Sequence, residues 1–369
     1  MRYLRGTWMR GGTSKCWLFD AAAVAAAGGD ADTLLAAAFG SGDPRQLDGV
    51  GGATSTTSKA AIVRRSDLPG IDVDYEFAQV GIGARRVEWG SNCGNCATAI
   101  GLYALLTGLV PVRAGHTTVR LRNINTGTLL SATVDTGDGA VPESGEVFVP
   151  GAAVGGVGIE LTFLDPAGAA TGSLLPTGNP VDALPVAATL VDAGAPAALI
   201  DAAAFGLTGG EPVDGLAPVV PELIRLRREA ALRMGLATAG SPVDHAIPKT
   251  GIVAPPVDYL AADGTPVAAG DYDLAVRMLS MLAPHPAVGL TSAVAIAAAT
   301  CVADGVVARA MGHRSPAVLR LGTPAGVVTV GVERDAGGAL RAVRMQRAAR
   351  RIAVAEISVP EPALVPLPA

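Results

Sequence analysis

Two stretches of the chain have the same order of a β-favouring strand, a turn of small residues and an apolar segment of helical period. The first runs from Ala84–Trp89 through Gly90-Ser91-Asn92 into an apolar segment that ends at Gly108. The second runs from Leu274–Leu282 through a turn containing Pro, Gly and Ser into a segment that ends near Ala303. Helices that are apolar on all sides are buried in a core. The repetition predicts two similar halves, each a sheet wrapped around one buried helix.

The expected fold class is therefore α/β (α+β), with two pseudo-equivalent domains. We place these domains at residues 1–184 and 185–369, with central helices that begin near residues 93 and 291, and we allow the last strand to return to the first domain. A chain of 369 residues is long enough for two such cores. Beyond these units, local patterns predict helices at residues 21–40, 196–205 and 221–237, and short strands over most of the remainder.

Composition limits the possible partners. The formal net charge is −5, and basic residues are interspersed with acidic ones, which argues against a nucleic-acid-binding face. No apolar run has the length of a membrane span without Gly, Pro or charge, and the first residues favour a strand over a signal peptide. With four cysteines in the chain, we expect a cytoplasmic protein without a membrane partner, and a homodimer is the default assembly.

Cys93 lies at the expected start of the first buried helix. The first backbone N–H groups of a helix lack intrahelical partners and carry a positive partial charge, which lowers the pKa of a nearby thiol. Asn92, Gly94 and Asn95 surround it with small, hydrogen-bonding residues. The pattern favours an acid/base thiol or a nucleophile beside an anion-binding pocket, and the alternative is a small buried packing residue.

Cys93 and Cys96 also form a C-x-x-C pair. A zinc site is disfavoured because Cys16 and Cys301 are isolated and no histidine lies at ligand spacing, so we expect no metal. A redox role stays open, although Cys96 one helical turn later is typical of a packing residue.

Several polar turns offer further candidates for binding. The turn around Ser14 is rich in Gly and hydroxyl groups and has Arg10 at its start, which suits a carboxylate, although a plain hairpin turn fits equally well. Lys59 follows Ser58 where a strand begins, and a functional lysine there would need burial or a neighbouring cation. Nucleotide-binding loops are absent, because the glycine-rich segment at residues 48–59 matches neither known spacing. The starts of the two buried helices are expected to face each other across a cleft that binds anions.

Four motifs in this order resemble the PrpF family, which includes 2-methylaconitate cis-trans isomerase, 3-methylitaconate Δ-isomerase and 4-oxalomesaconate tautomerase. They are Met9-Arg10-Gly11-Gly12-Thr13-Ser14-Lys15, Asp48-Gly49-Val50-Gly51-Gly52 with Ser58-Lys59, Ser91-Asn92-Cys93-Gly94-Asn95, and Pro176-Thr177-Gly178-Asn179. The resemblance covers nearly the whole chain. It implies the diaminopimelate epimerase-like fold, in which each of two domains is a β-barrel-like sheet around a central helix.

The resemblance also implies a function. The family isomerises small unsaturated di- or tricarboxylates without a cofactor, so the expected substrate is an acid such as 4-oxalomesaconate, methylaconitate, methylitaconate or aconitate. Cys93 and Lys59 match the family's proposed acid/base pair. The expected substrate-binding residues are Arg10, Ser14, Gly52, Ser58, Asn92, Gly94, Asn95, Thr177, Gly178, Asn179, Lys249, His285, Thr291 and Ser292.

Two positions depart from the family pattern. Cys16 replaces a common glycine after Thr-Ser-Lys, and Thr291-Ser292-Ala293 stands where Thr-Gly-Ala is usual. The second helix start has no cysteine before Cys301, so a racemase with two thiols is disfavoured. The alternatives are a non-catalytic carboxylate-binding protein on the same fold and a C-x-x-C oxidoreductase.

Overall fold

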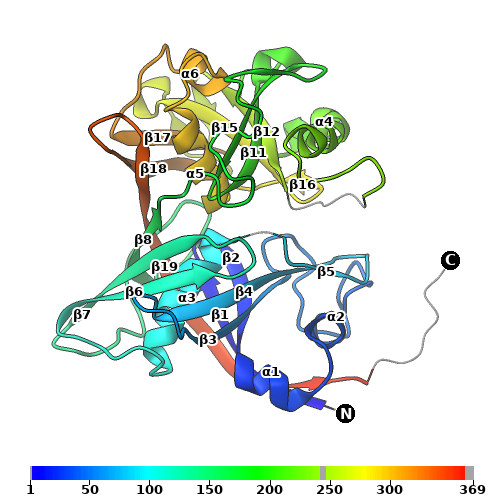
Figure 1. Ribbon diagram of the computed structural model, residues 1–369, viewed down its shortest axis with the longest axis vertical. Coiled ribbons are helices and arrows are strands. Elements are labelled where there is room, and N and C mark those ends of the chain that lie inside the picture. Colours follow the sequence, from blue (N-terminus) through cyan, green and yellow to red (C-terminus); the bar gives the residue numbers. More distant parts are fainter. Residues whose placement is uncertain (1, 91, 242–246, 362–369) are drawn as a thin grey trace.

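One long strand, β19 (Leu340–Val359), joins the two halves of the molecule (Figure 1). The computed structural model describes residues 2–90, 92–241 and 247–361, so Ser91 of the third motif lies outside the described residues. The first residues of β19 pair with β18 (Gly326–Arg334), the middle residues with β8 (Val157–Leu164), and the last with β1 (Arg2–Gly11). The strand that ends the described chain therefore completes the sheet that the first strand begins.

The first half is a closed ring of strands around one helix. Each neighbouring pair along β1-β2-β3-β4-β6-β7-β8-β19 is hydrogen-bonded, and β19 pairs back with β1. Helix α3 lies inside this ring, in contact with strands on all sides. The remaining bounds in this half are β2 (Ser14–Asp20), α1 (Ala21–Ala27), α2 (Ala31–Phe39), β3 (Lys59–Arg65), β4 (Val73–Val80), β5 (Val87–Glu88), α3 (Gly94–Leu106), β6 (Gly115–Asn123) and β7 (Leu129–Gly137).

The second half repeats the same order of strand orientations. From β10 through β11, β12, β15, β17 and β18 to β19, the pairings are antiparallel, parallel, antiparallel, parallel, antiparallel and antiparallel, as they are from β1 to β8. The bounds are β9 (Asp182–Ala183), β10 (Ala187–Ala193), β11 (Ala195–Asp201), η1 (Ala202–Phe205), η2 (Asp214–Val219), α4 (Val220–Arg233), β12 (Lys249–Ala254), β13 (Tyr259–Leu260), β14 (Pro266–Val267), η3 (Ala269–Asp271), β15 (Leu274–Ser280), β16 (Ala283–Pro284), α5 (Leu290–Ala299), α6 (Val306–Ala310) and β17 (Val318–Thr323). In this correspondence α5 takes the place of α3, and β12 that of β3. The boundary expected at residue 184 stays a prediction.

The two buried helices begin against each other. Gly94 is the first residue of α3, and a Cβ atom there would lie 2.6 Å from Cβ of Leu290, the first residue of α5. Only a hydrogen atom fits as the side chain at position 94, because the same Cβ atom would also lie 2.8 Å from Cζ of Phe163. Both helices belong to one continuous apolar core. The expected meeting of the two helix N-termini is thus a direct packing contact.

Two local predictions were wrong. Residues 196–205 form strand β11 followed by the short turn η1, although alanine and leucine there favour a helix. Position in the sheet outweighs this preference, because β11 is buried on both faces between β10 and β12. The helix expected at residues 21–40 is split into α1 and α2 by Gly28 and Gly29, which both have positive φ.

Membrane-spanning potential was assessed for the described helices. No single one is long and apolar enough to cross a bilayer. The bent pair α1 and α2 meets the length and composition criteria together, with an angle of 89° between its members.

The contact between α3 and β7 gives a test of the fold. Glycine to alanine inside a helix normally stabilises it by about 1 kcal/mol. At Gly101, however, the new Cβ would lie 2.4 Å from Cβ of Ala132. We expect Gly101→Ala to lower the free energy of unfolding by about 1–3 kcal/mol in denaturant titrations. Adding Ala132→Gly removes the opposing methyl group and should restore most of the loss. A stabilised single variant would contradict this packing.

Candidate active site

A polar pocket lies where α3 and α5 begin and where β3 and β12 start. It encloses about 480 Å³ of space, part of which is open to solvent. The structure brings together these residues expected from the sequence: Ser14, Lys59, Asn92, Cys93, Gly94, Asn95, Lys249, His285, Thr291 and Ser292. Other lining residues were not anticipated, namely Thr56, Phe77, Gln79, Leu279, Ser280, Gly289 and Leu290. Among the described residues, two lysines and no carboxylate line this pocket, which favours anions.

Three expected residues near the first motifs lie outside the pocket lining. Arg10 donates to the backbone carbonyls of Gly12, Val154 and Gly155 at 2.9–3.1 Å, so its guanidinium supports a loop. Ser58 is fully buried and its hydroxyl donates to Val80 O (3.0 Å). The Thr57 side chain occupies the place of a Cβ at Gly52.

The fourth motif also lies outside the pocket lining. Thr177 Oγ1 donates to Asp182 Oδ2 (2.7 Å), and Asn179 Nδ2 donates to Asp182 Oδ1 (3.2 Å). Gly178 between them has a φ of 75°. The side chains of this segment thus form a turn around the carboxylate of Asp182. The positive φ at Gly178 favours glycine over other residues.

Lys59 is the first residue of β3, and neighbouring side chains on the sheet fix its position. Its side chain is 7% exposed, and its Nζ donates to Gln79 Oε1, the residue opposite it in the β3–β4 ladder. Gln79 Nε2 donates to Ser58 O (2.9 Å), which fixes the amide with its oxygen toward the lysine. Nζ also lies 5.1 Å from the centre of the Phe77 ring. Sequence reasoning missed Gln79 because the register of the two strands is not visible in the sequence.

Cys93 is the N-cap residue of α3, as expected, but its protonation differs from the expectation. A hydrogen bond with the Cys96 thiol and burial raise the pKa of Cys93 well above its ordinary value, whereas nearby Lys59 acts in the opposite direction. The prediction of a thiol shifted toward thiolate was therefore wrong for the ligand-free protein. Helix N-terminal charge is outweighed by loss of solvent and by a neutral thiol neighbour.

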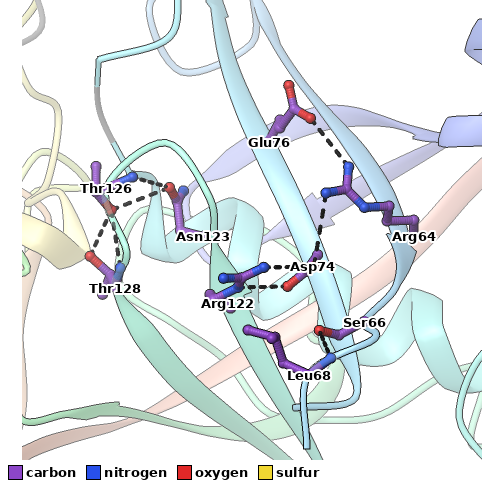
Figure 2. A network of polar contacts seen from close by, with 9 residues as sticks. All are labelled: Arg64, Ser66, Leu68, Asp74, Glu76, Arg122, Asn123, Thr126 and Thr128. Carbon is purple, nitrogen blue, oxygen red and sulfur yellow. Dashed lines mark hydrogen bonds and ion pairs between the residues drawn. The ribbon is translucent and has the colours of Figure 1, made fainter.

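A buried network sets the orientation of Asn92. The backbone N–H of Thr126 donates to Asn123 Oδ1 (3.0 Å), and this contact is visible in Figure 2. Asn123 must therefore present Nδ2 to Asn92 Oδ1 (3.2 Å), which also accepts from the Tyr75 hydroxyl (2.7 Å). The Nδ2 atom of Asn92 is buried without a partner in the described structure. Because Asn92 lines the pocket, this amide is a candidate donor to a ligand.

The β4–β6 edge that carries this network is fastened by charges. Figure 2 shows Arg122 bound to both oxygens of Asp74, at 2.8 and 2.9 Å, with Arg64 close by. Bidentate pairs of this kind fix geometry as well as charge. The hydrogen bond with Arg122 holds the pKa of Asp74 below its usual range.

The second half contributes an incomplete copy of the first. Lys249 begins β12 as Lys59 begins β3, and both lysines reach the same pocket. At the start of α5, Thr291 and Ser292 stand where α3 has a thiol. Acid/base chemistry at a thiol is consequently possible on one side only.

His285 adds a neutral donor. Its Nδ1 accepts from the backbone N–H of Ala287 (2.9 Å), so in the neutral ring Nε2 carries the hydrogen. Burial, together with the charges of Lys59 and Lys249, lowers the pKa of His285 to about 3. The ring is therefore an uncharged hydrogen-bond donor at neutral pH.

Among residues 2–90, 92–241 and 247–361, no group of three or more His, Cys, Asp or Glu side chains is placed to hold a metal ion.

Comparison with known proteins gives consistent matches over the whole length. Residues 1–360 match the family model described as PrpF protein. The chain is 38% identical to a 2-methyl-aconitate isomerase of Shewanella oneidensis, with 96% of each chain covered. It is 36% identical to a (4E)-oxalomesaconate Delta-isomerase of a Novosphingobium species, with 94% of each covered. A solved methylitaconate-delta-isomerase superposes with a TM-score of 0.76 at 31% identity, covering 96% of this chain and 95% of the other. These matches confirm the predicted diaminopimelate epimerase-like fold.

The raised pKa of Cys93 can be tested by alkylation. At pH 7–8 the thiol should react with iodoacetamide more slowly than a free cysteine of pKa ~8.5, and its rate should rise only in more alkaline solution. Replacing Cys96 by Ala removes the largest cause and should move the pH profile of Cys93 toward the ordinary range. Peptide-resolved mass spectrometry between pH 6 and 10 gives both profiles. A wild-type midpoint below pH 8 would contradict the assignment.

The pKa of His285 predicts a loss of stability in acid. The unfolded imidazole takes up a proton near its usual pKa of ~6.5, while the folded ring takes it up only near pH 3. The free energy of unfolding should therefore fall as pH drops below about 6.5, by up to about 1.4 kcal/mol per pH unit from this group. His285→Asn keeps an acceptor for Ala287 and should flatten the curve. Exposed His313→Asn controls for removal of one imidazole. Parallel curves for wild type and His285→Asn would refute the prediction.

Proposed function

The chain belongs to the PrpF family, and we propose that it is an isomerase that moves a proton within a small unsaturated di- or tricarboxylate without a cofactor. The relatives named above act on acids of this kind. The observation that carries the proposal is that Lys59 and Cys93 line one anion-attracting pocket at two helix starts. Methylaconitate, methylitaconate, aconitate and 4-oxalomesaconate are the candidate substrates.

The reaction removes a weakly acidic proton from a carbon next to a carboxylate, or from a position conjugated with it. The resulting dienolate takes a proton at another carbon, or at the same carbon after bond rotation. Negative charge develops on oxygen, so donors placed there in advance lower the barrier. In the proposed arrangement the donors are Asn92 Nδ2, His285 Nε2 and the first N–H groups of α3 and α5.

We assign the two proton-transfer roles as follows. Cys93 has a raised pKa and starts the cycle as a thiol, which makes it the proton donor to the dienolate. Lys59 accepts the proton from substrate, with Gln79 Oε1 holding one of its N–H groups. After the transfer, the ammonium of Lys59 returns a proton to the thiolate of Cys93, which closes the cycle without a net gain or loss of protons.

The proposal predicts solvent exchange that depends on both residues. With substrate in D2O, proton NMR should show a new isomer and deuterium at one carbon. Lys59→Ala and Cys93→Ala should each lower turnover by about 10²–10⁴-fold, since each removes one acid/base step. Lys15→Ala and Cys301→Ala, which change residues outside the pocket lining, are matched controls and should retain activity. Activity near wild type in Cys93→Ser or Lys59→Ala would refute the pair.

The same NMR experiment separates the two other functions that the sequence leaves open. Binding of every acid without exchange would indicate a carboxylate-binding protein. The contact between the Cys93 and Cys96 thiols keeps a C-x-x-C oxidoreductase as the second candidate. Formation of a Cys93–Cys96 disulfide with a potential in the thioredoxin range, about −270 mV, would support it.

We also propose a cytoplasmic location and a homodimer. A working thiol requires a reducing compartment. Two-fold dimers are the commonest assembly of enzymes of this size, and light scattering measures the mass directly.

A further inference from the structure

A buried arginine beside the pocket has no counter-ion among the described residues. Arg347 lies on β19 with its side chain on the inner face, which it shares with the core residues Val343 and Met345. The residue is 5% exposed. Within the described residues, the one hydrogen bond of its guanidinium is a long contact from Nη2 to Met345 Sδ (3.8 Å), and Nε has no partner.

This arrangement is costly for a structural residue. Removing a cation from water is unfavourable unless a carboxylate or several carbonyl groups replace the lost solvation. Burial lowers the pKa of Arg347 to about 10, and no charged group contributes to that shift. The guanidinium is still protonated at neutral pH, so the folded protein holds a positive charge that is available to an anion.

Arg347 lies next to the lining of the pocket. A Cβ atom on Gly12 would be 2.1 Å from Asn95 Oδ1 and 3.8 Å from Arg347 Cδ, so these two side-chain atoms are within 5.9 Å of each other. Asn95 lines the pocket, and its Nδ2 donates to Thr13 and Ser14 while Oδ1 is buried without a partner. An unpaired acceptor of the pocket lining therefore lies close to the side chain that carries the unpaired donor Nε.

We propose that Arg347 binds a carboxylate of the substrate, one that trans-aconitate carries and mesaconate lacks. The inference rests on the proposed function. Arg347 lies beside the lining that holds Lys59 and Cys93, a place suited to a carboxylate on a side arm of the substrate. Its planar fork matches a carboxylate in a bidentate manner, which a lysine cannot do. A ligand without this side-arm carboxylate would leave the charge of Arg347 unpaired.

The test compares two ligands that differ by one carboxylate. Dissociation constants of trans-aconitate, with three carboxylates, and mesaconate, with two, are measured by calorimetry on wild type and Arg347→Met. We expect the affinity for trans-aconitate to fall about 10- to 100-fold, the effect of one charge-assisted contact, while that for mesaconate changes less than about threefold. Arg347→Lys keeps the charge without the fork and should give an intermediate loss. If Arg347→Met does not fold, Arg347→Lys still tests the proposal.

Thermal unfolding distinguishes this role from a structural one. Arg347→Met removes an uncompensated buried charge and should leave Tm unchanged or raise it. The control is Arg277→Met, since Arg277 is equally buried but donates to the carbonyls of Glu211, Val276 and Gly322. That variant leaves these carbonyls unpaired and should lower Tm. A lower Tm in Arg347→Met with unchanged ligand preference would overturn the proposal, as would equal loss of both ligands.

The outcome is independent of catalysis. If trans-aconitate binds through Arg347 but no acid exchanges deuterium, the isomerase proposal fails while the carboxylate site stands. If an acid exchanges and Arg347→Met binds trans-aconitate like wild type, the isomerase proposal stands and the role of Arg347 is refuted.

Discussion

The arrangement of the pocket depends on the contact between the first residues of α3 and α5. Gly94 and Leu290 approach so closely that no residue larger than glycine fits at position 94. Each helix start has N–H groups without intrahelical partners, and their contact places both sets at one point. The lysines at the start of β3 and β12 reach this point as well. The sheets hold the helices, and the helices determine where negative charge can be accommodated.

The pocket keeps several hydrogen-bonding groups unsatisfied, which is unfavourable for folding. Asn92 Nδ2, Asn95 Oδ1 and Arg347 Nε are buried without partners in the described structure. Each such group costs about 1–3 kcal/mol when it is desolvated and unpaired. Asn92 and Asn95 line one cavity, where a ligand that completes their hydrogen bonds would recover this cost. Burial keeps His285 neutral, and the hydrogen bond with Cys96 together with burial keeps Cys93 a thiol.

Sequence patterns that are local and repeated predicted the structure well. The strand–turn–helix units around Cys93 and Thr291 were correctly placed, and they led to the fold. Properties that depend on distant pairing were not accessible in the same way. Gln79 faces Lys59 only through the register of β3 and β4, and Arg347 lies beside the pocket only because β19 crosses both halves. The pKa of Cys93 was misjudged because burial and the Cys96 contact follow from tertiary packing.

The position of β19 has a consequence for how the protein is made. The barrel around α3 lacks its eighth strand until residues 342–359 have been synthesised, because β8 and β1 both pair with this segment of β19. A nascent chain whose first half has left the ribosome therefore exposes two open sheet edges, which are sites for mispairing. The N-terminal half cannot complete its fold before the C-terminal half of the chain has been synthesised. Closure of the first barrel therefore comes after the synthesis of every other strand of both halves.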